Sequence, residues 1–252
     1  MTLKFAANLS FLFKELPFLE RFAEARIAGF TAVEVLFPYD VPASEIKDRL
    51  LRNDLDLVLI NTPPPNWTGG DRGFAAVIGG QDRFRHDFKR AMRFADMLGA
   101  QHLHIMSGCA EGPVAKATFV ENLKWATTLA ADQSLTIEPI NSHDMPGYYL
   151  NDFDLAAEIL DAVNAPNLAL QFDAYHAYHI TGDTLETWAT HGHRARHIQI
   201  AGALNRHEPV KGDIDYPAFF ARIKADGYAG YVSGEYHPKG RTEDGLNWLK
   251  TP

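Results

Sequence analysis

Strand-like and helix-like segments alternate along this chain from beginning to end. The strand-like segments lie near residues 3–8, 31–36, 55–61, 101–107, 134–139, 167–173, 195–200 and 229–236. Helix-like segments follow them near 17–28, 43–53, 81–98, 116–132, 151–163, 183–190, 215–225 and 241–250. This alternation is typical of a parallel sheet connected by crossover helices. Eight units of about 31 residues predict an α/β fold, a single (β/α)8 barrel that occupies residues 1–252 as one domain.

Four of the predicted strands end at an oxygen-bearing side chain. The runs LTIEPI, LALQFD, ARHIQIAG and YVSGEY carry Glu138, Asp173, Gln199 and Glu235, in that order. In each run the named residue shares its strand parity with small or polar residues, while the opposite parity is apolar. The carboxyl ends of parallel strands meet at one rim of a closed sheet. We therefore expect the four side chains to converge there, with the apolar parity facing the helices.

Three carboxylates this close together require a positive partner or a shared proton, because they repel one another in a partly buried site. An oxygen-rich set suits a hard divalent cation, and the absence of a set rich in cysteine and histidine disfavours structural zinc. We expect Mg²⁺ or Mn²⁺ at this rim. A pair of carboxylates that works without a metal is the alternative.

Three further side chains are expected to contact or support a substrate. His176 lies three residues after Asp173, where the chain turns toward the rim. Arg206 follows the strand near 195–200, and an arginine there can clamp a substrate carboxylate with two parallel hydrogen bonds. A surface ion pair between Arg206 and Glu208, or another loop carboxylate, is the competing interpretation. Asp144, in the loop after the strand near 134–139, is a candidate for orienting the side chains that contact the substrate.

Segment 61–80, NTPPPNWTGGDRGFAAVIGG, interrupts the alternation with three prolines and five glycines. A loop this long in a compact domain is often a lid or a wall of the substrate site. Trp67 and Phe74 favour an ordered loop, because free surface loops seldom carry such apolar bulk. The segment leaves its strand at the same rim as the candidate ligands.

Composition narrows the classes of partner. The formal net charge of −8 repels polyanions, so we expect no nucleic acid as a partner. No apolar stretch approaches the roughly 18 residues of a membrane span, so we expect no membrane partner. A single cysteine, Cys109, and the lack of a secretory pattern at the start favour a cytoplasmic protein. A small anionic substrate fits this picture, and a homo-oligomer is compatible with it.

Several motifs together resemble one family. FAANLSFLF, FTAVEVLFPYD, IEPIN, QFDAYH, HIQIAG-x₃-RHEP and GEYHPKG-x-TEDGL are similar to the hydroxypyruvate isomerase family within the xylose isomerase-like barrels, over nearly the whole chain. The resemblance implies one metal bound by Glu138, Asp173, Gln199 and Glu235, with both glutamates as proton-transfer groups. His176 and Arg206 match substrate-binding positions of the wider group. The sugar epimerases of that group usually carry histidine at position 199, where this chain has glutamine.

The implied reaction is a metal-dependent isomerisation of the aldose–ketose type, hydroxypyruvate to 2-hydroxy-3-oxopropanoate and back. It requires proton removal from one carbon and proton return to the next, through an enediolate. The sister branch of 2-oxo-tetronate isomerases, which act on four-carbon sugar acids, shares the FAANLS start and the IAG…RHEP loop. A related ketose 3-epimerase is a further alternative. A metal-dependent nuclease or a sugar-acid binding protein would be a different class.

Overall fold

The computed structural model describes residues 2–63, 72–210 and 212–250. Its strands are β1 (Lys4–Asn8), β2 (Ala32–Glu34), β3 (Asp56–Leu57), β4 (Leu59–Asn61), β5 (His102–His104), β6 (Ser134–Ile137), β7 (Leu168–Asp173), β8 (Ala195–Ile200) and β9 (Tyr231–Gly234). Its α-helices are α1 (Arg21–Ile27), α2 (Ala43–Arg52), α3 (Gln81–Leu98), α4 (Gly112–Leu129), α5 (Phe153–Val163), α6 (Ala174–Thr181), α7 (Thr184–His191) and α8 (Tyr216–Ala225). Three 3₁₀ segments complete them, η1 (Phe18–Glu20), η2 (Gly192–Arg194) and η3 (Thr242–Lys250).

The strands form one parallel sheet in the order β3-β2-β1-β9-β8-β7-β6-β5-β4. Only Val58 separates β3 from β4, so the two ends of this order belong to one stretch of chain. The Val58 amide donates to the carbonyl of Val33 at 2.8 Å, and the Asn61 amide donates to the carbonyl of Leu36 at 2.8 Å. These bonds close the sheet into a barrel, which confirms the predicted fold. The third predicted strand is divided because β3 pairs with β2 whereas β4 pairs with β5.

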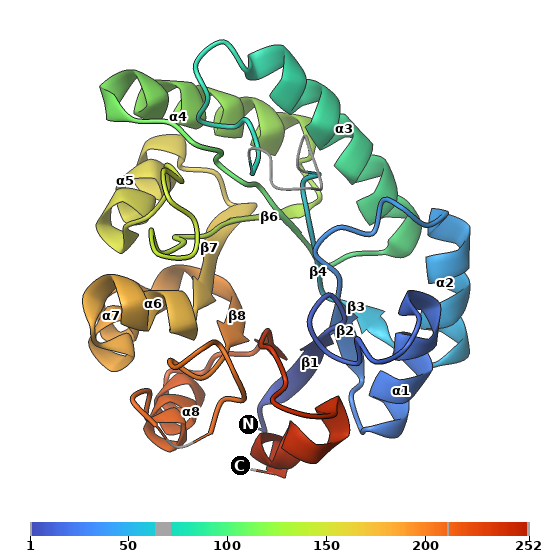
Figure 1. The fold of residues 1–252 in the computed structure, drawn as a ribbon. Coiled ribbons are helices and arrows are strands. Elements are labelled where there is room, and N and C mark those ends of the chain that lie inside the picture. Colours follow the sequence, from blue (N-terminus) through green and yellow to red (C-terminus); the bar gives the residue numbers. More distant parts are fainter. Residues whose placement is uncertain (1, 64–71, 211, 251–252) are drawn as a thin grey trace.

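Helices surround the sheet on the outside (Figure 1). The strand side chains of apolar parity face these helices, as expected from alternation. Phe172 of β7 illustrates the contact: its ring lies 5.4 Å from Phe153 of α5, 5.1 Å from Trp188 of α7 and 5.9 Å from Phe219 of α8, between ring centroids. The strand side chains of polar parity point to the barrel interior and the rim.

Two segments at the rim differ from the prediction or extend beyond it. Helix α6 begins directly after Asp173, where a simple turn was expected, because the Asp173 side chain caps it by accepting a hydrogen bond from the Tyr175 amide at 2.8 Å.

Residues 64–71 of the predicted lid, with Trp67, lie outside the described residues. Where the chain is described again, a Cβ on Gly73 would lie 2.3 Å from the carbonyl oxygen of Met106, so this position requires glycine. The lid function stays a prediction.

In the described part of the chain, no helix combines the length and hydrophobicity that crossing a membrane requires.

Candidate active site

A cavity of about 640 Å³ opens at the carboxyl ends of the strands. Six of the seven predicted site residues line it: Glu138, Asp144, His176, Gln199, Arg206 and Glu235. The seventh, Asp173, is 1% exposed and does not line the cavity. Its carboxylate contacts Arg206 instead. Cavities of about 700 and 800 Å³ lie at the amino ends of strands, away from these side chains. The chemistry-bearing groups therefore share one rim, as the strand parity predicts.

The strands place the four predicted ligands in register. Asp173 of β7 pairs with Gln199 of β8, and Gln199 pairs with Ser233 of β9, two residues before Glu235. Glu138 follows β6 directly. All four residues are nearly inaccessible, at 5% exposure or less. The convergence of the four strand ends follows from parallel pairing in a closed sheet.

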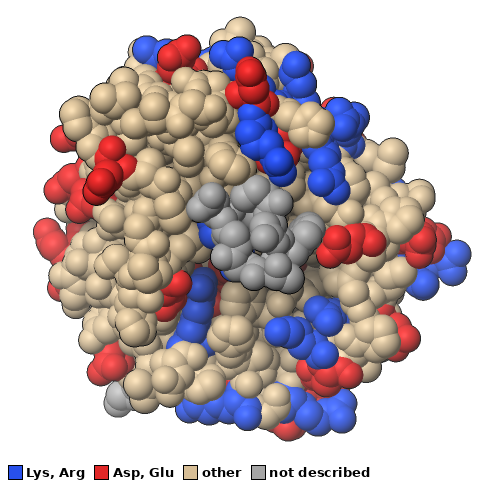
Figure 2. Space-filling model, turned by 45° about the horizontal axis from the view of Figure 1, so that its top comes forward, with Lys and Arg blue, Asp and Glu red and all other residues tan. Residues whose placement is uncertain are grey.

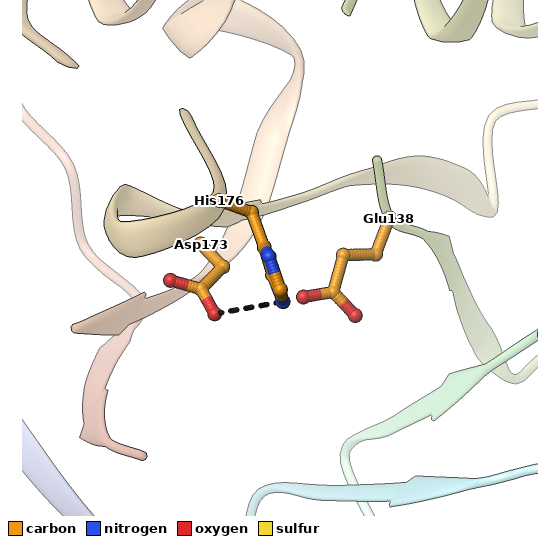
Figure 3. Close-up of side chains that lie close together, drawn as sticks. All are labelled: Glu138, Asp173 and His176. Carbon is orange, nitrogen blue, oxygen red and sulfur yellow. Dashed lines mark ion pairs between the residues drawn. The ribbon is translucent and has the colours of Figure 1, made fainter. Parts of the chain in front are cut away.

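Glu138, Asp173 and His176 point toward one another (Figure 3). Each offers one ligand atom, and these atoms lie within 4.8 Å of one another, which makes the three residues a candidate metal-binding triad. Asp173 Oδ2 is 3.6 Å from His176 Nε2. The triad shares two members with the predicted ligand set and adds the histidine.

The hydrogen bonds of His176 indicate which ring nitrogen carries the proton. Asn141 Oδ1 accepts from the amides of His143 at 3.0 Å and Asp144 at 2.9 Å, so the Asn141 side-chain nitrogen is the end that faces His176 Nδ1, at 2.7 Å. Nδ1 is therefore an acceptor, and Nε2 holds the proton. Burial, with a smaller contribution from Arg206, lowers the pKa of His176 well below its usual value. A neutral imidazole with Nε2–H is arranged to donate a hydrogen bond rather than to ligate a metal.

Arg206 lies among acidic groups and between two aromatic rings. Its guanidinium carbon is 5.2 Å from the Phe11 ring centroid and 4.9 Å from that of Tyr175. Nη2 is 3.0 Å from Asp173 and 3.3 Å from Glu235, and Nη1 is 3.8 Å from Asp144.

These contacts argue against an ion pair with Glu208, which accepts instead from the Lys239 amide at 2.9 Å. The carboxylate clamp stays a prediction. Burial disfavours the charged form of Arg206, but the nearby carboxylates, Glu235 foremost, outweigh it and raise the pKa of Arg206.

The acidic cluster carries more potential negative charge than Arg206 can balance. Burial raises the pKa of Glu138 well above its usual value, and repulsion by Glu235 and Asp173 raises it further. Burial likewise raises the pKa of Glu235, against the attraction of Arg206. Three buried carboxyl groups with one guanidinium favour an additional cation or bound protons. The donor set, which is mostly oxygen, fits a hard divalent cation.

A buried hydrogen-bond network lies beneath the cluster, and sequence reasoning did not find its centre. Gln171 Nε2 donates to Glu138 at 3.1 Å and to Gln199 Oε1 at 2.7 Å. Gln199 Nε2 donates to Glu34 at 2.8 Å, and Glu34 also accepts from Asn8 at 2.7 Å. Glu34 is fully buried. An acidic residue in the middle of the apolar strand AVEVL was the available signal.

Known proteins resemble this chain over its whole length. It is 43% identical over 253 residues to the 2-oxo-tetronate isomerase of Cupriavidus necator, an alignment that covers 98% of this chain and 97% of that protein. It is 38% identical over 253 residues to the hydroxypyruvate isomerase of Escherichia coli, with 98% of both chains covered.

A solved structure described as AP endonuclease, family 2, from Brucella melitensis matches with a TM-score of 0.95 and 41% identity, covering 99% of this chain and 98% of that one. The solved structure of the 3-keto-D-glucoside 4-epimerase YcjR from E. coli matches with a TM-score of 0.81 at 18% identity over the full length of both chains, which shows the fold alone. Residues 22–251 match the family described as xylose isomerase-like TIM barrel. With the closed parallel barrel and the acidic rim, these matches show that the chain belongs to the xylose isomerase-like TIM barrel family.

Proposed function

We propose that this protein is an isomerase of small hydroxy-keto acids, which moves a carbonyl group between adjacent carbons. The expected reaction is hydroxypyruvate to 2-hydroxy-3-oxopropanoate and back. The relatives named as hydroxypyruvate isomerase and 2-oxo-tetronate isomerase support this class of substrate. The four-carbon 2-oxo-tetronate is the second candidate, and the 43% identity to an enzyme of that name favours it.

The observation that carries the proposal is the pair of buried glutamates at one cavity. Glu138 and Glu235 line the same cavity from β6 and β9, two strands that are separated by β7 and β8. Burial raises the pKa of both, so each holds a proton more readily than an ordinary glutamate does. We assign one as the base that removes a proton from carbon and the other as the acid that returns a proton to the neighbouring carbon. General acid–base catalysis of this kind contributes about 10²- to 10⁴-fold.

Glu138, Asp173, Gln199 and Glu235 would hold the metal, with Mg²⁺ or Mn²⁺ as the expected ion. Their donors are oxygens, the ligands that these cations prefer. When bound, such an ion acts as a Lewis acid that stabilises negative charge on substrate oxygens. His176 is left out of this set because its Nδ1 is engaged by Asn141 and its Nε2 carries the proton.

The remaining predicted residues bind and orient the substrate in this proposal. Arg206 holds the substrate carboxylate, and its guanidinium contacts the rings of Phe11 and Tyr175. His176 donates from Nε2 to a substrate oxygen. Asp144 positions Arg206, since it accepts from the Tyr175 hydroxyl at 3.2 Å and lies 3.8 Å from the guanidinium.

Cleavage of abasic DNA is the rival function that the description of the Brucella melitensis structure suggests. The formal charge of −8 opposes it, and Figure 2 shows basic side chains interspersed with acidic ones on the face drawn. A non-catalytic sugar-acid binding protein is the other class, and it would need no pair of glutamates. Incision of an abasic-site oligonucleotide would support the first rival, and tight binding of hydroxypyruvate without turnover would support the second.

The proposed function is tested by following hydroxypyruvate and 2-oxo-tetronate by NMR with purified protein. We expect isomerisation that EDTA abolishes and Mg²⁺ or Mn²⁺ restores. Proton transfer to and from carbon should also introduce solvent deuterium at the reacting carbon in D₂O. Full activity of metal-stripped protein would overturn the metal assignment, and no isomerisation of either acid would overturn the proposed function.

A further inference from the structure

Asn61, the last residue of β4, lines the active-site cavity, and its side-chain oxygen is buried without a hydrogen-bond partner among the described residues. Its backbone is fixed, since its amide donates to Leu36 and its carbonyl accepts from the Tyr39 hydroxyl. The residue is 4% exposed and lines the cavity. Its Oδ1 makes no hydrogen bond to any residue that the structure describes. A buried acceptor left without a donor costs about 1–3 kcal/mol, so Oδ1 favours a donor from outside the described residues, such as a group bound in the cavity.

Most polar side chains around Asn61 are paired with one another. Thr136 donates to Gln171 at 3.1 Å, and Gln171 donates onward to Gln199. His104, the neighbour of Asn61 across β4 and β5, is the exception among them: neither ring nitrogen makes a hydrogen bond to a described residue, and Nδ1 lies 3.7 Å from the Glu138 carboxylate. A water molecule held between Asn61 and His104 would therefore be one explanation, and a substrate group that reaches Asn61 is the other.

The position of β4 in the barrel favours a substrate group. Three strands separate β4 from β8 in the sheet order, and on the other side β9, β1 and β2 lie between them. Asn61 thus lies across the barrel from Gln199, whereas Glu138, Asp173 and Glu235 come from the half around β8. A substrate held by adjacent oxygens at the acidic cluster extends the rest of its chain across the cavity toward β4.

The wall around Asn61 specifies the chemistry of that group. Leu36, Phe37 and Met106 line the same cavity and are apolar. Arg72 also lines the cavity. A hydrogen-bond acceptor beside apolar side chains fits a hydroxymethyl group, whose CH₂ packs against carbon and whose O–H donates to Oδ1. An ionised carboxylate cannot make this bond, because it has no proton to donate.

We propose that Asn61 forms a subsite for the terminal hydroxymethyl group of a four-carbon hydroxy-keto acid, and that this contact makes four-carbon acids better substrates than three-carbon ones. Hydroxypyruvate ends at the reacting carbon, so it has no further hydroxymethyl group to reach Asn61. The inference rests on the proposed function, because it uses the same cavity and the same reaction.

The test compares kcat/KM for two four-carbon acids, 2-oxo-tetronate and its 4-deoxy analogue, which carries a methyl group in place of the hydroxymethyl group. For the unmodified protein we expect the analogue to be about 10-fold poorer, the value of one hydrogen bond to a buried acceptor. Asn61→Leu removes the acceptor at similar volume, so the preference for 2-oxo-tetronate over the analogue should fall about 10-fold. Equal kcat/KM for the two acids in the unmodified protein would overturn the subsite, and so would a preference that Asn61→Leu leaves unchanged.

Asn122→Leu is the matched control. Asn122 of α4 is fully buried, its Oδ1 also has no partner among the described residues, and it does not line the cavity. This variant should keep the preference of the unmodified protein. If Asn61→Leu does not fold, the comparison of the two acids in the unmodified protein still decides. Isomerisation of these acids without discrimination would overturn the subsite alone, whereas no isomerisation of any acid would overturn the proposed function as well.

Discussion

Replacing Glu34 by leucine should remove the acceptor of three buried hydrogen-bond donors at once. Asn8 and Gln199 donate to Oε1 at 2.7 and 2.8 Å, and His197 Nε2 lies 2.6 Å from Oε2. Leucine has a similar volume but accepts no hydrogen bond, so all three donors would stay buried and unpaired. At about 1–3 kcal/mol each, the free energy of unfolding should fall by about 3–9 kcal/mol. That loss is comparable with the whole stability of a typical domain, about 5–15 kcal/mol.

Glutamine at position 34 should be tolerated far better. Its remaining oxygen can still accept from Asn8 and Gln199. His197 can move its proton to Nδ1, which has no partner among the described residues, and then accept from the new amide at Nε2. We expect Glu34→Gln to lower the free energy of unfolding by about 1–2 kcal/mol.

The assay is urea unfolding followed by tryptophan fluorescence and circular dichroism. Glu34→Leu should either unfold at a much lower urea concentration or yield no folded protein. Glu158→Leu is the control, because Glu158 is an exposed partner of Lys116 and such surface pairs contribute only about 0–1 kcal/mol. A Glu34→Leu variant within 1 kcal/mol of the unmodified protein would refute the assignment of Glu34 as the centre of the network.

Three further outcomes are expected. Glu138→Gln and Glu235→Gln should each lower kcat at least about 10²-fold, measured by NMR, and a tenfold or smaller effect for both would remove them from the mechanism. Arg206→Ala should lower kcat/KM for an acidic substrate about 30- to 1,000-fold, with partial rescue in Arg206→Lys, whereas an equal loss with an uncharged analogue would contradict a carboxylate clamp. Burial raises the pKa of Glu138 and Glu235 in the folded protein. Their favourable contribution to the free energy of unfolding is therefore complete below the ordinary glutamate pKa of 4.5 and is lost as pH rises through the folded pKa. As pH rises above 4.5, the metal-free unmodified protein should therefore lose thermal stability relative to metal-free Glu138→Gln. Mn²⁺ should stabilise the unmodified protein more at higher pH. A difference in melting temperature between the two proteins that does not change with pH would contradict this.

The features that depend on local sequence patterns were predictable. Alternating parity placed Glu138, Asp173, Gln199 and Glu235 at one rim, because a strand exposes every second side chain to the same face. The closed barrel then brought them together without further information. Helix α6 was missed, but the other α-helices were predictable for the same reason, since an amphipathic period and the end signals of a helix lie within a few residues of one another.

Features that depend on closure of the barrel were not predictable. Glu34 receives hydrogen bonds from His197 and Gln199, more than 160 residues away in sequence. No local pattern reports such a pairing, and the sequence shows only that an acidic residue interrupts an apolar strand. The partner of Arg206 was open for the same reason, because Glu208 is near in sequence whereas Asp173 is near only in the folded chain. The unpaired Oδ1 of Asn61 likewise exists only once its neighbours have formed bonds elsewhere.

Gln199 cannot be replaced without affecting its hydrogen-bond partners. One amide does two things there: Oε1 accepts from Gln171 at 2.7 Å, and Nε2 donates to Glu34 at 2.8 Å, while a second lone pair on Oε1 is left for a cation. A histidine, the residue that sugar epimerases of the wider group usually carry, has only two ring nitrogens for these three tasks. Exchanging Gln199 for histidine would leave Gln171, Glu34 or the proposed metal without a bond. Residues 34, 171 and 199 thus form one hydrogen-bonded unit, and converting this barrel to epimerase chemistry would require redesign of all three together.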